Sequence, residues 1–168
     1  EGRGEVISCD LHPHKKKLIQ AGADRLGLEN ITPMTADGKA FRPEWESAFD
    51  RVLVDAPCSG LGVIRKKPDI RYKDPGPLAD LPQVQRAILD NAARYVKPGG
   101  VLVYSTCTLL RRENEEVALD FLAGHPDFKA EGFRLPECVE DGRTGLLTLW
   151  PHRQGTDGFF ICKLRKEG

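Results

Sequence analysis

Two cysteines, Cys58 and Cys107, each follow an apolar segment of the kind that forms buried β-strands. Segment 49–54 (FDRVLV) precedes an Asp-Ala-Pro turn and Cys58, and segment 101–105 (VLVYS) leads to Cys107. In open α/β sheets, ligands bind beyond the carboxyl ends of the strands, so both thiols are expected at a ligand site. A thiolate is a strong nucleophile, and the pair therefore points to covalent catalysis.

The other three cysteines call for no chemistry. Cys9 and Cys162 lie within expected strands, where a cysteine is most often buried packing material, and Cys138 lies in an expected loop. No CxxC pair and no Cys/His cluster at zinc spacing occurs. We therefore predict neither a metal site nor a disulfide framework.

Three acidic residues also follow expected strand ends. Asp10 ends segment 5–10, Asp37 follows segment 31–36, and Asp55 follows the strand before Cys58. Acids are common in turns, so each alone is weak evidence of binding. As a set with the cysteines, they are expected to line one ligand crevice.

A basic run lies beside Cys58. It comprises Arg65, Lys66, Lys67, Arg71 and Lys73. Such a run is often only a solvated loop, but next to a reactive cysteine it could contact the phosphates of a nucleic acid.

Apolar periodicity predicts alternating strands and helices along the whole chain. The expected strands are 5–10, 31–36, 49–54, 101–105, 128–132 and 159–164, and the expected helices are 12–28, 81–96 and 113–122. Segment 60–77 is rich in Gly, Pro, Lys and Arg and is expected to be a long loop. This pattern predicts an α/β fold with a mostly parallel sheet covered on both faces.

Composition sets limits on function. The 168 residues suit one domain, and 25 basic residues balance 25 acidic ones, which is unlike a dedicated non-specific nucleic-acid binder. No apolar stretch is long enough to span a membrane, and the first residues do not resemble a signal peptide. A cytoplasmic location is expected.

Two motifs resemble those of a known family. DAPCSG at 55–60 and STCT at 105–108 are similar to motifs of the Sun family of RNA cytosine-5 methyltransferases, within it the branch of bacterial enzymes that modify small-subunit ribosomal RNA. The likeness continues through GVIRKKPDIR, KPGG, RRENE and TDGFFICKL, and so covers nearly the whole chain. It implies methylation of cytosine C5 in ribosomal RNA with S-adenosylmethionine as the cofactor.

The resemblance also implies a role for each candidate residue. Cys107 matches the nucleophile that adds to C6 of cytosine, and Cys58 matches the cysteine that assists product release. Asp55 matches the acid that contacts the cytosine edge and borders the cofactor. Asp10 matches the residue on the cofactor ribose, and Asp37 the one near the adenine. The basic run would contact RNA.

The implied fold is the Rossmann-like methyltransferase fold, here over residues 1–168 as a partial catalytic domain. No strand and glycine-rich turn precede Asp10. We therefore expect a domain truncated at its N-terminus, lacking the first strand and the glycine-rich loop, that binds S-adenosylmethionine weakly alone. The strand edges left open by this loss are expected to promote self-association.

Other functions remain to be weighed. A non-catalytic RNA-binding fragment is the main alternative. Amino-group methyltransferases carry an Asn/Asp-Pro-Pro-aromatic motif after the same strand, whereas this chain has Asp55-Ala56-Pro57-Cys58. A dehydrogenase is disfavoured because no glycine fingerprint occurs.

Overall fold

The computed structural model describes residues 3–72, 74, 76–135 and 142–168, so Lys73 and Cys138 lie outside the described residues. The chain divides into two compact units, Glu1–Phe41 and Arg42–Gly168. Each unit is described by itself, and a single partial domain over 1–168 stays a prediction.

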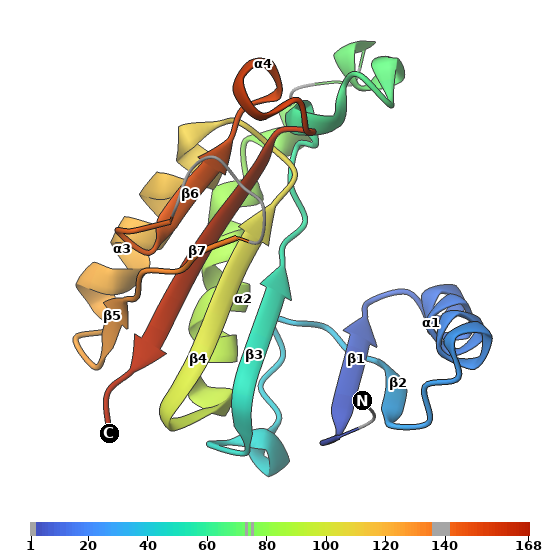
Figure 1. Ribbon diagram of the computed structural model, residues 1–168, viewed down its shortest axis with the longest axis vertical. Helices are drawn as coiled ribbons and strands as arrows, with labels where there is room; N and C mark the ends of the chain where they lie inside the picture. The colour runs from blue at the N-terminus through green and yellow to red at the C-terminus, as the bar shows by residue number, and fades with distance from the viewer. Residues whose placement is uncertain (1–2, 73, 75, 136–141) are drawn as a thin grey trace. The chain divides into compact units, whose positions relative to one another are not determined.

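The first unit consists of β1 (Val6–Asp10), α1 (Pro13–Leu26) and β2 (Ile31–Thr35), shown in blue in Figure 1. The two strands pair in parallel along their whole length. Helix α1 has a proline in its first turn and ends at Gly27, whose φ of 64° is the left-handed conformation typical of helix ends. This β-α-β arrangement brings the carboxyl ends of β1 and β2 to the same edge.

The second unit contains a five-stranded sheet. Its strands are β3 (Phe49–Asp55), β4 (Val96–Thr106), β5 (Phe128–Ala130), β6 (Leu146–Leu149) and β7 (Phe159–Lys166). The order is β3-β4-β7-β5, with β6 also pairing with β7. Among the described strands of this unit, only β3 and β4 pair in parallel, and β7 runs antiparallel to its three neighbours.

The expectation of a mostly parallel sheet is therefore wrong for this unit. Parallel neighbours need a long crossover connection, which α2 (Leu81–Tyr95) and its flanking segments supply between β3 and β4. From β6 to β7 the chain returns through a short segment that holds only α4 (Pro151–Gln154), and such a link suits antiparallel strands.

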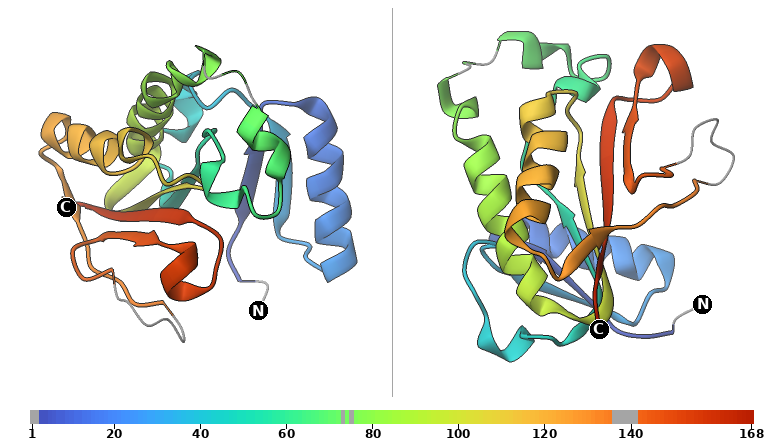
Figure 2. Two further views of the ribbon diagram at one scale, coloured as in Figure 1. Left: turned by 90° about the horizontal axis from the view of Figure 1, so that it is seen from above. Right: turned by 90° about the vertical axis from the view of Figure 1, so that its left-hand side faces the viewer.

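Helices α2 and α3 (Glu115–Gly124) lie together on one face of this sheet (Figure 2). The core of the unit fills the space between them and the strands. Its fully buried apolar side chains are Leu89, Val96, Leu102, Tyr104, Ala118, Phe121, Phe160, Cys162 and Leu164. Burial of these side chains fixes α2 and α3 against the strands that carry the candidate site.

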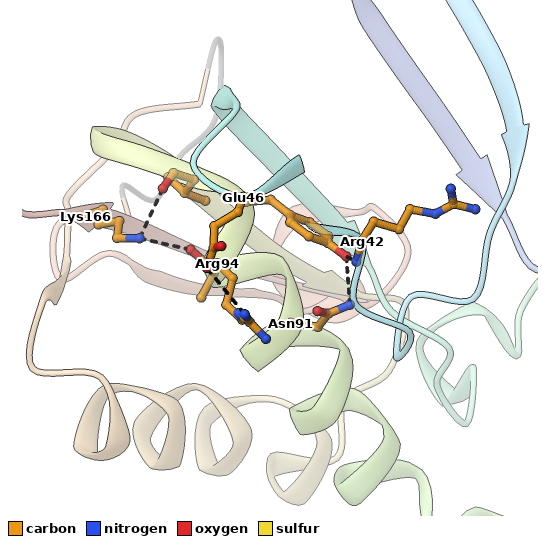
Figure 3. Close-up of polar contacts among 8 residues, drawn as sticks. Arg42, Glu46, Asn91, Arg94 and Lys166 are labelled. Atoms are coloured by element: carbon orange, nitrogen blue, oxygen red, sulfur yellow. Dashed lines mark hydrogen bonds and ion pairs between the residues drawn. The ribbon is translucent and has the colours of Figure 1, made fainter. Parts of the chain in front are cut away.

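The C-terminal end of α2 is tied to the sheet by polar contacts (Figure 3). Lys166 Nζ donates to the carbonyl oxygens of Ala93 and Val96 at 3.3 and 3.1 Å. The hydroxyl of Tyr95 accepts a hydrogen bond from the backbone N–H of Arg42 at 2.9 Å. A cation at the last carbonyls complements the helix dipole, so these contacts favour a fixed helix end.

Several boundaries differ from those expected. Strand β4 begins at Val96 rather than at residue 101, and its additional residues lie beside a register shift between Phe49 and Arg51 of β3. The expected loop 60–77 contains three short 3₁₀ helices, η2 (Leu61–Val63), η3 (Pro68–Tyr72) and η4 (Gly76–Leu78). A further 3₁₀ turn, η5 (Arg111–Glu113), precedes α3, while η1 (Pro43–Trp45) precedes β3.

No helix in the described part of the chain is long and apolar enough to cross a membrane.

Candidate active site

Cys58 and Cys107 lie in contact at the carboxyl ends of the parallel strands β3 and β4. Asp55, the last residue of β3, is opposite Ser105 in β4. Each cysteine follows its strand closely, and the two Sγ atoms are 3.2 Å apart, within hydrogen-bonding distance for sulfur. Two residues 49 positions apart in the sequence thus form one thiol pair.

The two thiols of this pair differ in acidity. The pKa of Cys107 is lowered from 9.0 to about 7, chiefly by the hydrogen bond from Cys58 and to a small extent by the charge of Lys67, against desolvation and the negative Asp55. The pKa of Cys58 is raised, first by its hydrogen bond to Cys107 and then by burial. Cys107 is therefore the thiolate of the pair and Cys58 the proton donor to it.

Asp55 is held beside the pair by β4. Ser105 Oγ lies 3.3 Å from Asp55 Oδ1 and donates to it, while the backbone N–H of Ala56 donates to the Ser105 carbonyl at 2.9 Å. Asp55 is exposed. It is thus able to accept a hydrogen bond from a ligand near the thiols.

A buried polar layer lies beneath the Cys58 turn. Glu113 and Gln85 are both fully buried. Glu113 Oε2 accepts hydrogen bonds from the backbone N–H of Ser59 at 2.8 Å and from Gln85 Nε2 at 3.1 Å. Gln85 Nε2 also donates to the carbonyl of Pro57 at 2.9 Å.

A second set of polar contacts surrounds Cys107. Thr106 Oγ1 donates to Asn114 Oδ1 at 2.5 Å, and Asn114 Nδ2 donates to the carbonyl of Thr108 at 3.0 Å. The hydroxyls of Ser59 and Thr108 are 2.7 Å apart and join the two cysteine turns.

Sequence analysis assigned no role to this layer. A signal was present at Gln85, which precedes Leu89 by one helical turn and so interrupts the apolar stripe of α2 with a polar side chain. A polar residue on a buried helix face needs a partner, and here the partners are the site turns.

Backbone contact at Gly62 joins the loop after Cys58 to Cys107. Gly62 N–H donates to the Cys107 carbonyl at 2.9 Å, and Gly158 N–H donates to the Gly62 carbonyl at 2.8 Å. A Cβ atom on Gly62 would lie 2.0 Å from the Gly158 oxygen. Only glycine allows this approach.

The four basic residues assigned to RNA lie in two environments. Arg65 and Lys66 pair with Asp157, at 3.7 and 2.5 Å, while their side chains stay largely exposed. Lys67 and Arg71 are exposed, and Lys67 is close enough to Cys107 to lower its pKa.

Asp10 and Asp37 lie in the first unit, at the carboxyl ends of β1 and β2. Asp10 Oδ1 accepts the N–H of His12 and Asp37 Oδ1 accepts the N–H of Lys39, both at 2.9 Å. Each carboxylate is thereby oriented and keeps a second oxygen that can accept hydrogen bonds. Carboxylate acceptors at neighbouring strand ends fit the hydroxyl and amino donors of a nucleoside.

The remaining described cysteines have different environments. Cys162 is fully buried in β7, and burial raises its pKa to about 12, which suits an inert packing residue. Cys9 in β1 is exposed, contrary to the expected packing role.

Comparison with known proteins identifies the family of the chain. The model of the 16S rRNA methyltransferase RsmB/F family matches residues 1–165. Over its whole length, the chain is 52% identical to the probable ribosomal RNA small subunit methyltransferase B of Bacillus subtilis, and the match covers 39% of that protein. Over 98% of its length, it is 37% identical to the ribosomal RNA small subunit methyltransferase F of Salmonella agona, and the match covers 35% of that protein.

Solved structures give the fold. The crystal structure of NSun6 from Pyrococcus horikoshii with SFG matches 99% of this chain and 42% of that one, with a TM-score of 0.79 and 29% identity. The expected Rossmann-like fold of S-adenosylmethionine-dependent methyltransferases is thereby confirmed. The chain spans between 35% and 39% of the curated relatives named above. It belongs to the 16S rRNA methyltransferase RsmB/F family.

Proposed function

We propose that this chain carries the catalytic cysteines of an enzyme that methylates C5 of a cytosine in ribosomal RNA. The observation that carries the proposal is the 3.2 Å contact between Cys58 and Cys107 at the ends of β3 and β4. Family membership supports ribosomal RNA as the substrate class, and the resemblance of both cysteine motifs to the Sun family supports cytosine C5 as the target.

Cys107 is the proposed nucleophile. Its lowered pKa of about 7 keeps a substantial fraction as thiolate near neutral pH. The thiolate adds to C6 of cytosine, forming an S–C6 bond and making C5 electron-rich, because C5 is otherwise a poor nucleophile. C5 would then form a bond to the methyl group as the bond between that methyl and the donor's sulfonium sulfur breaks, with its electron pair left on sulfur. The C5 hydrogen would leave as a proton to water, and the S–C6 electron pair would return to Cys107.

Cys58 and Asp55 are proposed to serve this cycle. The thiol of Cys58 hydrogen-bonds to Cys107, so it can stabilise Cys107 as the leaving thiolate when the S–C6 bond breaks. The exposed carboxylate of Asp55 would accept a hydrogen bond from the cytosine edge and border the cofactor.

S-adenosylmethionine, the cofactor of the family, would supply the methyl group as an electrophilic sulfonium methyl. Asp10 is proposed to bind its ribose hydroxyls and Asp37 its adenine amino group. Both carboxylates are oriented by backbone N–H groups, which makes them suitable acceptors.

RNA contact is proposed for Arg65, Lys66, Lys67 and Arg71. Because Arg65 and Lys66 pair with Asp157, they would exchange this partner for RNA phosphates, whereas Lys67 and Arg71 are exposed already. The target base must be unstacked so that a thiol can reach C6. A ribosomal substrate would place the protein in the cytoplasm.

Two substitutions test the proposal in the complete gene product that contains this chain. Cys107→Ser should reduce methylation of ribosomal RNA at least ~10³-fold, because a hydroxyl is far less ionised than a thiol near pH 7. Cys58→Ala should accumulate a covalent protein–RNA complex that denaturing gels detect, because release is slowed. Methylation at the normal rate by Cys107→Ser would refute the nucleophile. Binding of RNA without any methylation by the unmodified protein would favour the non-catalytic alternative.

A further inference from the structure

Each cysteine turn is held on both sides by buried side chains, and these side chains converge on two consecutive residues. Glu113 contacts the turn of Cys58, and Asn114 contacts the turn of Cys107. Both are almost completely buried. Two adjacent residues between β4 and α3 thus contact both halves of the thiol pair.

On the Cys58 side, the contacts reach the residue before the cysteine and the residue after it. Glu113 accepts the N–H of Ser59, and Gln85, which donates to Glu113, also donates to the carbonyl of Pro57. The two peptide groups that flank Cys58 are therefore both held by the Gln85–Glu113 pair.

On the Cys107 side, the contacts also reach the residues before and after the cysteine, through one hydroxyl and one carbonyl. Asn114 accepts from the hydroxyl of Thr106 and donates to the carbonyl of Thr108. The hydroxyl of Tyr104 donates to the carbonyl of Glu113 at 2.6 Å, which ties the dipeptide back to β4. The side-chain bridge between Ser59 and Thr108 then closes the two halves on each other.

Burial of this layer has an energetic disadvantage. Among the described residues, Glu113 Oε1 and Gln85 Oε1 are buried without a hydrogen-bond partner. A buried polar atom left unpaired costs about 1–3 kcal/mol, so an apolar pair of the same size would pack here more favourably. The presence of the polar pair Gln85 and Glu113 is explained if its hydrogen bonds hold the Cys58 turn in place.

We propose that Glu113 and Asn114, with Gln85, are positioning residues that set the contact between the two catalytic thiols. Their hydrogen bonds described above go to the residues before and after each cysteine, and they act through these neighbours. By keeping Cys58 within hydrogen-bonding distance of Cys107, they maintain the raised acidity that the nucleophilic thiol needs. That this contact serves catalysis rests on the proposed function, whereas its effect on the acidity of the two thiols does not.

The test measures thiol chemistry, without RNA or cofactor. The rate of alkylation of Cys107 by iodoacetamide is followed from pH 5 to pH 10, with the modified cysteine identified by mass spectrometry. Cys58→Ala removes the hydrogen-bond donor to Cys107 and should lower this rate at pH 7 by roughly five- to tenfold. The smaller fraction of Cys107 present as thiolate has a larger effect on the rate than the higher reactivity of each thiolate.

Glu113→Leu keeps the side-chain volume and removes the acceptor. We expect it to lower the alkylation rate at pH 7 as Cys58→Ala does, and the double variant to show no further loss, because both changes remove the same hydrogen bond. Glu113→Gln keeps a carbonyl acceptor and should restore much of the normal pH profile. Gln85→Met, a milder change, should shift the profile in the same direction.

Phe128→Leu is the matched control. It removes buried volume from the same core, away from the turns, and should lower stability while leaving the alkylation profile unchanged. A folded Glu113→Leu or Gln85→Met variant with the normal profile would overturn the proposal, as would an equal shift in Phe128→Leu. Loss of methylation by Cys107→Ser is a separate result, so the two proposals can fail independently.

Discussion

The thiols of Cys58 and Cys107 are made different by their surroundings. A hydrogen bond can lower the pKa of only one partner, and here that partner is Cys107, whereas the hydrogen bond and burial both raise the pKa of Cys58. The pH dependence of the site follows: Cys107 gains thiolate as pH rises through about 7 and loses it below. The acidic side of any activity profile should reflect this ionisation.

The charge of Lys67 can be tested separately. Because Lys67 is exposed, its effect on the pKa of Cys107 is weakened by solvent and by salt. Lys67→Gln should slow alkylation of Cys107 at pH 7 by less than about twofold at low ionic strength, and the difference should vanish in about 1 M salt. Arg71→Gln is the control, with no measurable change expected. A salt-independent effect of Lys67→Gln would point to a structural cause.

The positions of Asp55, Cys58 and Cys107 at strand ends could be predicted from the sequence alone, because each follows a continuous apolar segment. The burial of Glu113 and Asn114 could not be predicted from the sequence. Both lie in a polar segment that reads as the exposed start of a helix, and their burial depends on how α3 packs on the sheet. Tertiary packing of this kind leaves no periodic signal in the chain.

At the scale of elements, the parallel pairing of β3 and β4 is the feature that creates the site. Both strands were predicted nearly to their observed ends at the site edge, since their central residues are continuous and apolar. Strand β6 was missed, and β4 was expected to begin only at residue 101. In both cases pairing to a neighbouring strand overrides local sequence preference.

The backbone contact between Gly62 and Gly158 gives an element-scale prediction. Gly62→Ala would place a methyl group against the Gly158 carbonyl and should destabilise the second unit by about 2 kcal/mol. Urea unfolding followed by tryptophan fluorescence measures this, because Trp45 and Trp150 both lie in that unit. Gly22→Ala, in α1 with open space around it, is the control and should leave this transition unchanged. Full stability of Gly62→Ala would contradict the close approach.

At the scale of the whole molecule, the five-stranded sheet has β3 at one end of its strand order. An edge strand offers unpaired backbone groups to other chains, so the expected self-association stays a prediction that light scattering can test. The antiparallel part around β7 could not be foreseen, because strand direction depends on which distant strands meet. Alternation of helices and strands alone suggested a mostly parallel sheet.

Acid stability of the second unit should depend on Glu131. Its carboxylate contacts Arg165 and Lys163, and these two cations, Arg165 first, lower its pKa from 4.5 to about 2. A pKa lowered by folding stabilises the protein above the unfolded value near 4.5, and this stability is lost as the pH falls toward 2.

Glu131→Gln should therefore reduce the free energy of unfolding by about 1 kcal/mol at pH 6, and the difference should narrow below about pH 4.5. Urea titrations at pH 6, 4.5 and 3.5 measure it. Glu116→Gln, at an exposed position of α3, serves as the control with no such trend. A difference between Glu131→Gln and the unmodified protein that stays constant with pH would argue against this ion pair.

The pairing of β3 with β4 also bears on the order of events during folding. The two sulfur atoms are 49 residues apart in sequence and meet only once a parallel ladder has closed around α2. Closure of such a long loop is slow compared with formation of a helix or hairpin. The reactivity of Cys107 is thus acquired late, and a newly made chain passes through its early compact states with two ordinary, poorly nucleophilic thiols.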